Sequence, residues 1–563
     1  MKGVYRISNG LIILLATFTI AVSATDLGFF KYYNSRITNA VFDWSDDIGL
    51  MLKIMLSNST YLPYFLAFIV MVLVYIFLQK RIVSFVIARP HRRMQLFQRI
   101  VIFLAVLALV FFGIRGTFNL NHRPLNSDDA YFSENPFLNQ LSFNPVFSFV
   151  NSYNQTQIHY FKSDEEAITR ALHYLDRKRS QSENPFEVYQ NGTDSIHPNI
   201  IFFFLESMSN AMVSRYHPGQ NTTPFFDSIA EQGIVFDNFF SAGIHTYNGI
   251  FSSLYGLPAI MHNKPMNSVE TANNLFHGLP NILKERKYEN YFFVTGDKTF
   301  DNMNGFLIPN GFDRIISESD YPASNIKDGW GITDEIMFNR VIEECDALYK
   351  QDKKFFINIL TISTHEGYSI PDAYSGILSN KDYPEKRYEF LDILLREFMH
   401  TAKTKDWFEH TVFIFVGDHG QNFSPVYDMS LNYHKIPLII YAPRYFNHFA
   451  YKHIGLQQDI YPTVCGLLDF GFVNNSLGVD LFRHQRKYGY FSSDNKLGVI
   501  DSTHYLIYRS ENNISMYNYR SNSLTDVYEG NTVIADSMKD YAFSMLQSAQ
   551  FLINNDLSNS PTK

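Results

Sequence analysis

Three long apolar runs occupy the first 118 residues, and shorter apolar runs alternate with polar stretches after them. The early runs are LIILLATFTIAVSA (11–24), YLPYFLAFIVMVLVYIFL (61–78) and IVIFLAVLALVFFGI (100–114). The third run extends back through Leu96 and Phe97. Because a helix needs about 20 mostly apolar residues to cross a bilayer, the pattern predicts a membrane anchor of about three helices over residues 1–118.

Basic residues between the runs predict the orientation of this anchor. Six Lys or Arg residues lie between positions 80 and 99, and Lys2 and Arg6 precede the first run. Short basic loops stay in the cytoplasm, so the chain after residue 118 is predicted to lie outside it. The end of the first run, Val22-Ser23-Ala24, also fits a cleaved secretory signal. The two further spans favour an uncleaved anchor.

The remainder of the chain divides into a polar linker and an alternating region. Residues 119–195 are rich in turns, with one predicted helix at 163–180 that Ser163 caps. From residue 196 to 563, apolar runs at 199–205, 291–296, 355–363, 411–417 and 437–443 alternate with helical stretches. Uninterrupted apolar runs are typical of strands buried on both faces. The alternation predicts an α/β domain with a largely parallel central sheet, closed by a small C-terminal antiparallel sheet.

Composition excludes several classes of function. The net charge of −8 provides no basic surface for nucleic acid. The two cysteines, Cys345 and Cys465, lie far apart and outside any CxxC or CxPxR motif. The sequence therefore predicts neither a cysteine zinc site nor a disulfide framework. An apolar content of 46% suits a membrane-attached globular protein.

Reactive residues follow several of the predicted strands. The first strand ends in Glu206, the strand at 411–417 ends in Asp418 and His419, and the strand at 355–363 leads to His365. Since ligands gather beyond the carboxyl ends of strands in an open α/β sheet, these residues are predicted to converge. A buried carboxylate such as Glu206 is costly unless it is paired or metal-bound. Pairing with a Lys or Arg is the alternative to a metal.

A further candidate lies at the start of a predicted helix within AGIHTYNGIFSSLYGLP (242–258). Thr246 stands at or near the helix N-terminus, where free amides and the helix dipole favour an anion. Its hydroxyl can attack a phosphoryl or sulfuryl centre once a metal lowers its pKa, whereas an ordinary N-cap threonine is the alternative. Three oxygen ligands and one imidazole suit Mn²⁺ or Mg²⁺, with Zn²⁺ as a further candidate. This set consists of Glu206, Thr246, Asp418 and His419.

These motifs resemble those of lipoteichoic acid synthase-type phosphoglycerol transferases, within the sulfatase and alkaline phosphatase superfamily. The similar segments, in the order of the family, are NIIFFFLES (199–207), HTYNGIFSSLYGLP (245–258), GWGITDEIMF (329–338), ISTHEGY (362–368), FVGDHG (415–420), HKIPLIIYAP (434–443), DIYPT (459–463) and SLGVDLF (476–482). The membrane-spanning start also fits the family. The resemblance implies an extracytoplasmic, alkaline-phosphatase-like α/β domain.

The resemblance also implies roles for individual residues. It makes Thr246 the nucleophile and assigns the metal, usually manganese, to Glu206, Thr246, Asp418 and His419. His365 matches a histidine that contacts the substrate phosphate or the leaving group, with a capping histidine as the alternative. His434 matches a histidine near the site of related phosphoethanolamine transferases, and a plain loop residue is the alternative there.

The segment FFVTGDKTFDNMNGF (292–306) departs from the family pattern. The polymer synthases carry a His, a Trp and an Arg that grip the glycerol phosphate, where this chain has Val294, Asp301 and Met303. Without the Arg, bidentate phosphate binding is lost. The pocket is expected to be reshaped by Asp297, Lys298 and Asn302. The candidate substrate contacts are therefore His365, His434, Asp297 and Asn302.

The sequence as a whole predicts a metal-dependent phosphotransferase in a bacterial cell membrane. The enzyme would move a phospholipid head group from a donor lipid, through a phospho-threonine, to a cell-envelope glycan or lipid. The favoured head group is glycerol phosphate, and the favoured donor is a phosphatidylglycerol-like lipid. One alternative is a phosphoethanolamine transferase or phosphodiesterase of the same superfamily. The other is a non-catalytic membrane regulator that keeps the fold.

Overall fold

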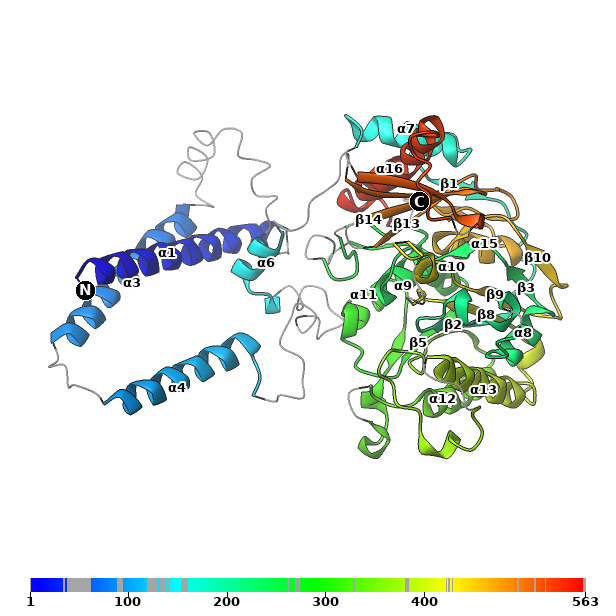
Figure 1. The fold of residues 1–563 in the computed structure, drawn as a ribbon, viewed down its shortest axis with the longest axis horizontal. Coiled ribbons are helices and arrows are strands. Elements are labelled where there is room, and N and C mark those ends of the chain that lie inside the picture. Colours follow the sequence, from blue (N-terminus) through cyan, green and yellow to red (C-terminus); the bar gives the residue numbers. More distant parts are fainter. Residues whose placement is uncertain are drawn as a thin grey trace. The chain divides into compact units, whose positions relative to one another are not determined.

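The structure is a computed structural model in which the 563-residue chain forms two compact units, residues 1–156 and 157–563 (Figure 1). It describes residues 2–33, 36–37, 62–88, 95–118, 130, 138, 141–152, 160–217, 219–261, 263–268, 271, 274–327, 330–379, 384–421, 423, 426–427, 429–493, 496–510, 513–521 and 523–559. Part of the predicted basic loop, at residues 89–94, lies outside this set.

The described part of the first unit contains three helices long and apolar enough to cross a membrane. The stretches are Ile7–Phe30 in α1 (Lys2–Tyr33), Pro63–Phe85 in α3 (Leu62–Ala88) and Leu96–Arg115, which is α4. All three predicted runs are therefore helical, and α1 extends well beyond both ends of the predicted run. A polar contact joins two of the helices, because the Gln79 Nε2 donates to the Asn9 Oδ1 at 2.9 Å.

An eight-stranded mixed sheet forms the centre of the second unit. Its spatial order is β10 (Phe449–Tyr451), β3 (Ile234–Phe236), β9 (Leu438–Tyr441), β8 (Thr411–Gly417), β2 (Asn199–Leu205), β7 (Lys354–Leu360), β5 (Tyr288–Val294) and β6 (Arg314–Ile316). Strand β9 runs antiparallel to both of its neighbours, whereas all other neighbouring strands are parallel. The predicted strand at 437–443 is thus the reversed one.

Helices cover both faces of the sheet, which explains its uninterrupted apolar strands. Along β2, Ile200, Phe202 and Phe204 face one core, and Ile201, Phe203 and Leu205 face the other, because side chains alternate along a strand. The helices of the first core include α9 (Thr246–Tyr255), α10 (Leu279–Glu285), α15 (Ile460–Leu467) and α16 (Thr532–Asn554). Those of the second are α8 (Pro224–Ala230), α12 (Asp334–Lys350) and α13 (Glu385–Ala402).

The C-terminal part adds the predicted small antiparallel sheet. Its strands, in order, are β13 (Gly489–Ser493), β14 (Lys496–Ile500), β15 (His504–Ser510) and β16 (Asn513–Asn518). A buried ion pair fastens this part to the main body, since the Arg486 Nη2 lies 2.5 Å from the Asp459 Oδ1. The same guanidinium also contacts the hydroxyl of Tyr541 on α16 at 3.1 Å.

Helix α7 (Asp164–Tyr174) belongs to the second unit and packs against α16. The Ser163 hydroxyl accepts from the Glu166 amide at 3.2 Å, so the predicted cap is present, although the helix ends at Tyr174 and not at residue 180. The Tyr174 hydroxyl donates to the Asp540 carboxylate at 3.0 Å. The Phe161 amide donates to the Gln547 side chain at 3.0 Å. The later part of the predicted linker is therefore folded onto the α/β body.

Helix α8 receives its N-terminal cap from a different helix. Thr223 stands at the N-cap position, but its side chain does not cap the helix. Instead, the buried Asp392 carboxylate of α13 accepts from the Phe225 amide at 3.0 Å and from the Phe226 amide at 2.8 Å. Two amides that lack a partner within the helix are thus satisfied by a tertiary contact.

Replacing Asp392 by alanine is expected to lower the free energy of unfolding by about 2 kcal/mol, because buried amides lose their acceptor. Urea unfolding of the detergent-solubilised chain, followed by tryptophan fluorescence, measures the change. Glu397→Ala removes an exposed carboxylate from the same helix and serves as the control. Equal stability of the two variants would contradict the capping role.

Candidate metal and catalytic site

The register of two neighbouring strands places two carboxylates side by side. Strands β2 and β8 are parallel, and Leu205 pairs with Gly417 at their carboxyl ends. The next residues are Glu206 and Asp418, of which 4% and 0% are exposed. The predicted convergence at this edge of the sheet follows directly from that register.

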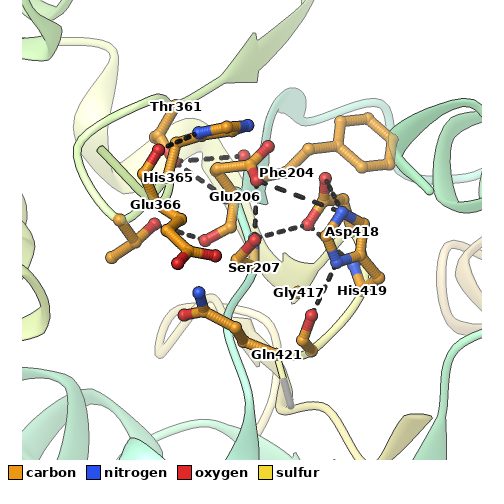
Figure 2. Close-up of polar contacts among 12 residues, drawn as sticks. Phe204, Glu206, Ser207, Thr361, His365, Glu366, Gly417, Asp418, His419 and Gln421 are labelled. Carbon is orange, nitrogen blue, oxygen red and sulfur yellow. Dashed lines mark hydrogen bonds and ion pairs between the residues drawn. The ribbon is translucent and has the colours of Figure 1, made fainter. Parts of the chain in front are cut away.

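Glu206, Asp418 and His419 form a compact group of potential metal ligands (Figure 2). Their ligand atoms lie within 4.8 Å of one another. The His419 Nε2 is 3.6 Å from the Asp418 Oδ2 and 4.0 Å from the Glu206 Oε1. No lysine or arginine forms an ion pair with Glu206 in the described part of the chain, so the alternative of a basic partner has no support there.

The hydrogen bonds around this group leave its ligand atoms available to a cation. The His419 Nδ1 lies 2.6 Å from the Gly420 carbonyl oxygen, to which it donates. In the neutral ring the Nε2 lone pair then faces the carboxylates, as in metal-bound histidines. The Asp418 Oδ2 is buried and has no hydrogen-bond partner among the described groups. A buried, unpartnered carboxylate oxygen beside an imidazole fits a divalent cation.

The electrostatics of the group point the same way. Burial, and after it the charge of Glu206, raises the pKa of Asp418 above its usual range. Burial lowers the pKa of His419, but the Asp418 and Glu206 carboxylates outweigh it and the net pKa is raised. Both shifts reflect negative charge held out of water. A bound cation relieves this repulsion.

Ser207 links the two carboxylates. Its hydroxyl donates to the Glu206 Oε1 at 2.7 Å, and its amide donates to the Asp418 Oδ1 at 2.8 Å. Its carbonyl accepts from the buried Tyr388 hydroxyl at 2.6 Å. Ser207 adopts a φ of 51°, which is uncommon for a residue with a side chain. Strained backbone of this kind clusters at functional sites.

The helix that Thr246 opens is held against the same edge. Helix α9 begins at Thr246 and ends before Gly256, whose φ is 70°. In its first turn, Gly249 contacts the Asp418 main chain, and a Cβ at that position would lie 2.4 Å from the Asp418 carbonyl oxygen. Only glycine permits this approach. The buried Gln457 links Asp418 to the segment before this helix. Its Nε2 donates to the Asp418 carbonyl at 2.7 Å, and its Oε1 accepts from the Ala242 amide at 2.8 Å.

His365 lies on a turn that contacts the main chain of Glu206 (Figure 2). The turn follows β7, and the Thr364 hydroxyl donates to the Glu206 carbonyl oxygen. The His365 Nδ1 is 2.8 Å from the Glu366 carbonyl oxygen. The ring of Trp330 packs on the His365 ring, with centroids 4.4 Å apart. His365 is thus a neighbour of the metal-ligand group, on the side opposite Asp418 and His419.

The other predicted substrate contacts have different surroundings. His434 is fully buried and stacks on Phe491, with ring centroids 4.2 Å apart, and burial lowers its pKa to about 3. Asp297 is exposed and accepts from the Thr299 amide at 2.8 Å. Asn302 is buried, and its amide nitrogen donates to the Met266 carbonyl. Contact of these three residues with substrate remains a prediction.

Sequence reasoning missed the residues that orient the site. Ser207 was visible only as the residue after Glu206, and its positive φ has no sequence signal. Tyr388 lies inside an amphipathic helix, and Gln457 lies in a turn, so neither carries a recognisable motif. Their roles depend on contacts between segments more than 150 residues apart for Tyr388 and 39 residues apart for Gln457.

Comparison with known proteins finds similar sequences for the second unit. Residues 198–470 match the Sulfatase family. The lipoteichoic acid synthase-like YvgJ of Bacillus subtilis (strain 168) is 23% identical over 359 residues, which cover 56% of this chain and 55% of that protein. The lipoteichoic acid synthase of Staphylococcus aureus (strain USA300) is 25% identical over 353 residues, which cover 57% and 52%. The chain thus matches about half the length of these relatives.

Solved structures show the same fold. A protein of the alkaline phosphatase superfamily from Vibrio parahaemolyticus superposes with a TM-score of 0.64 at 22% identity, covering 71% of this chain and 98% of the other. The lipoteichoic acid synthase LtaP from Listeria monocytogenes superposes with a TM-score of 0.57 at 18% identity, covering 69% and 98%. The second unit therefore has an alkaline-phosphatase-like α/β fold, and the match of residues 198–470 to the Sulfatase family together with the curated relatives confirms the resemblance to lipoteichoic acid synthase-type proteins.

Replacing Ser207 by glycine is expected to weaken Mn²⁺ binding about tenfold while leaving the fold intact. Glycine accepts the positive φ but removes the hydroxyl that orients Glu206, and loss of such an outer contact typically costs 10- to 100-fold in metal affinity. Isothermal titration calorimetry on the full chain measures the change. Ser209→Ala is the control, because the Ser209 hydroxyl donates to the Asn432 carbonyl and not to a candidate metal ligand. Unchanged affinity in Ser207→Gly would refute this role.

Metal affinity is expected to rise with pH between about 6 and 8. A proton and a metal ion compete for the same ligand atoms, and the raised pKa values of Asp418 and His419 place that competition near neutral pH. Binding should therefore release protons, more of them at the lower pH. Calorimetry in buffers of different ionisation enthalpy counts the protons released. A pH-independent affinity would show that another set of atoms holds the ion.

Proposed function

We propose that this protein is a membrane-anchored, metal-dependent phosphotransferase that moves a phospholipid head group through a phospho-threonine. The observation that carries the proposal is the joint placement of Glu206, Asp418 and His419 at one edge of the sheet, with the first turn of the Thr246 helix packed on Asp418. An acidic ligand group beside a hydroxyl at a helix N-terminus suits attack on a phosphate ester.

The metal would be held by Glu206, Asp418 and His419, with the Thr246 hydroxyl as a further ligand. When bound, the ion supplies charge stabilisation for the phosphoryl oxygens and lowers the pKa of the hydroxyl. Manganese is the proposed ion, because two carboxylates, a hydroxyl and one imidazole form a predominantly hard ligand set. Magnesium and zinc are the alternatives that metal analysis would separate.

The chain's own residues would carry two successive transfers. In the first, the Thr246 oxygen gives its proton to water and bonds to phosphorus, and the bond from phosphorus to the diacylglycerol oxygen breaks. That oxygen would take a proton from the Nε2 of His365 in its imidazolium form, and the contact of Nδ1 with the Glu366 carbonyl supports this choice of nitrogen. In the second, an acceptor hydroxyl gives its proton to the His365 Nε2 and bonds to phosphorus. The bond from phosphorus to the Thr246 oxygen breaks, and that oxygen takes a proton from water.

Glycerol phosphate from a phosphatidylglycerol-like lipid is the proposed group, and a cell-envelope glycan or lipid is the proposed acceptor. The lipoteichoic acid synthase names of the curated relatives support this choice. The three apolar helices support attachment to a membrane, and the bacterial cell membrane is the proposed location. The basic residues between positions 80 and 99 support placing the α/β unit on the extracytoplasmic side. Membrane attachment would keep the nucleophile near a lipid donor and raise its effective concentration.

The segment around Asp301 favours a second candidate head group. Met303, at the position of the family's arginine, is buried, so no basic side chain from that position reaches the site. Asp301 adds negative charge close enough to raise the pKa of His419. Phosphoethanolamine carries an ammonium that tolerates such a charge, which keeps a phosphoethanolamine transferase as the second candidate.

Intact-mass spectrometry of the full chain in lipid nanodiscs tests the proposal. With Mn²⁺ and phosphatidylglycerol, we expect a covalent adduct of glycerol phosphate on the wild type and on Thr246→Ser, and none on Thr246→Ala. With phosphatidylethanolamine, an adduct of the other mass would select the second candidate. Absence of both adducts, together with absence of diacylglycerol release, would contradict transfer through Thr246.

A further inference from the structure

The segment Trp330–Asp334 lies beside the His365 turn and has no role in the proposed chemistry. It ends at Asp334, the first residue of α12, whereas the turn, residues 362–366, follows β7. The two segments are 28 residues or more apart in the sequence, yet several contacts join them. These contacts determine what the segment does for His365.

Asp334 binds the backbone of the turn. Its carboxylate accepts from the Ile362 amide at 3.0 and 3.2 Å and from the Ser363 amide at 2.9 Å, and the Ser363 hydroxyl donates to it as well. The residue is fully buried, and no salt bridge to it occurs in the described parts of the chain. The cost of burying its charge is offset by these hydrogen-bond donors and by the N-terminus of the 17-residue helix α12. Two of the three donors belong to the turn's main chain.

Trp330 and Gly331 complete the contact. The Trp330 ring packs on the imidazole of His365 and also lies near Gly367. Gly331 has a φ of 76°, and a Cβ there would lie 1.9 Å from the Thr295 carbonyl oxygen. The Ile332 amide donates to that same oxygen at 2.9 Å. Gly331 and Ile332 therefore pack at the carboxyl end of β5, and the neighbouring Trp330 contacts His365.

The remaining contacts of the turn fix its other sides. The Arg387 Nη1 donates to the His365 carbonyl at 2.5 Å, and the Thr364 hydroxyl donates to the Glu206 carbonyl. The imidazole Nδ1 is engaged by the Glu366 carbonyl. Rotation of the ring is thus limited by Trp330 on one face and by this hydrogen bond at one nitrogen. The Nε2 is the nitrogen left for a reacting group.

We infer that Asp334 and Trp330 are positioning residues for His365: Asp334 fixes the main chain of the turn, and Trp330 fixes the plane of the imidazole. This inference rests on the proposed function, in which the His365 Nε2 exchanges a proton with the leaving and attacking oxygens. Proton transfer requires the donor within hydrogen-bond reach of the reacting oxygen. A displacement of about 1 Å is enough to reduce such a rate about 100-fold.

A double-mutant cycle on the full chain in nanodiscs tests the inference, with diacylglycerol release as the assay. Asp334→Asn is expected to lower kcat about 10- to 100-fold with little change in KM, because the amide group presents N–H to amides that need an acceptor. In a His365→Ala background the same substitution should lower kcat no further. Trp330→Leu, at a partly exposed position, should show the same pattern and covers the case in which Asp334→Asn fails to fold.

Asp346→Asn is the matched control, since Asp346 lies on the same helix and accepts from Lys405 and Trp407 far from the turn. Its kcat should equal that of the wild type. Losses that multiply in the double variants would overturn the positioning role. Absence of turnover by the wild type would contradict the proposed function instead. In that case, amide hydrogen exchange at residues 362–363 tests the positioning role without an activity assay. Faster exchange in Asp334→Asn supports that role, and unchanged exchange overturns it.

Discussion

The placement of two buried carboxylates at the ends of adjacent strands is the constraint on which this structure depends. Glu206 and Asp418 follow paired positions in β2 and β8, so the sheet itself forces them together. Like charges held this close and out of water repel strongly. Hydrogen bonds from Ser207 and the ring of His419 reduce that repulsion, and the arrangement of the group suits a cation that would reduce it further.

The strands that lead to these carboxylates are buried along their whole length. The phenylalanines of β2 and β8 are buried on both faces of the sheet, and Phe203 stacks on Phe415 with centroids 4.8 Å apart. Dense packing of this kind leaves little freedom for the strand ends. The candidate metal-ligand group therefore follows buried strands, whereas the candidate substrate contacts Asp297, Asn302, His365 and His434 lie on segments that connect the strands.

Two supports meet at the main chain of Glu206. One comes from Asp418, through Ser207 and the close contact with Gly249, and it holds the candidate ligands and the helix that begins at Thr246. The other comes from α12 and the His365 turn, which reaches the Glu206 carbonyl through Thr364. A displacement of β2 would disturb both. This shared point couples the metal side and the histidine side of the site.

The local sequence predicted the elements and the candidate metal ligands. Uninterrupted apolar runs are distinctive because strands buried on both faces have no polar side, so β2, β7 and β8 were predictable. Carboxylates and an imidazole directly after such strands indicated a metal site, since strand ends of one direction share an edge. The long apolar helices were predictable from hydropathy alone.

Only the tertiary structure decided how these parts are oriented. The reversal of β9, the cap that Asp392 gives to α8 and the positive φ of Ser207 have no local signal, because each depends on a segment distant in the sequence. The burial of His434 against Phe491 likewise results from packing with the C-terminal sheet. Residue type and spacing fix which groups can react, whereas long-range contacts fix where each one points.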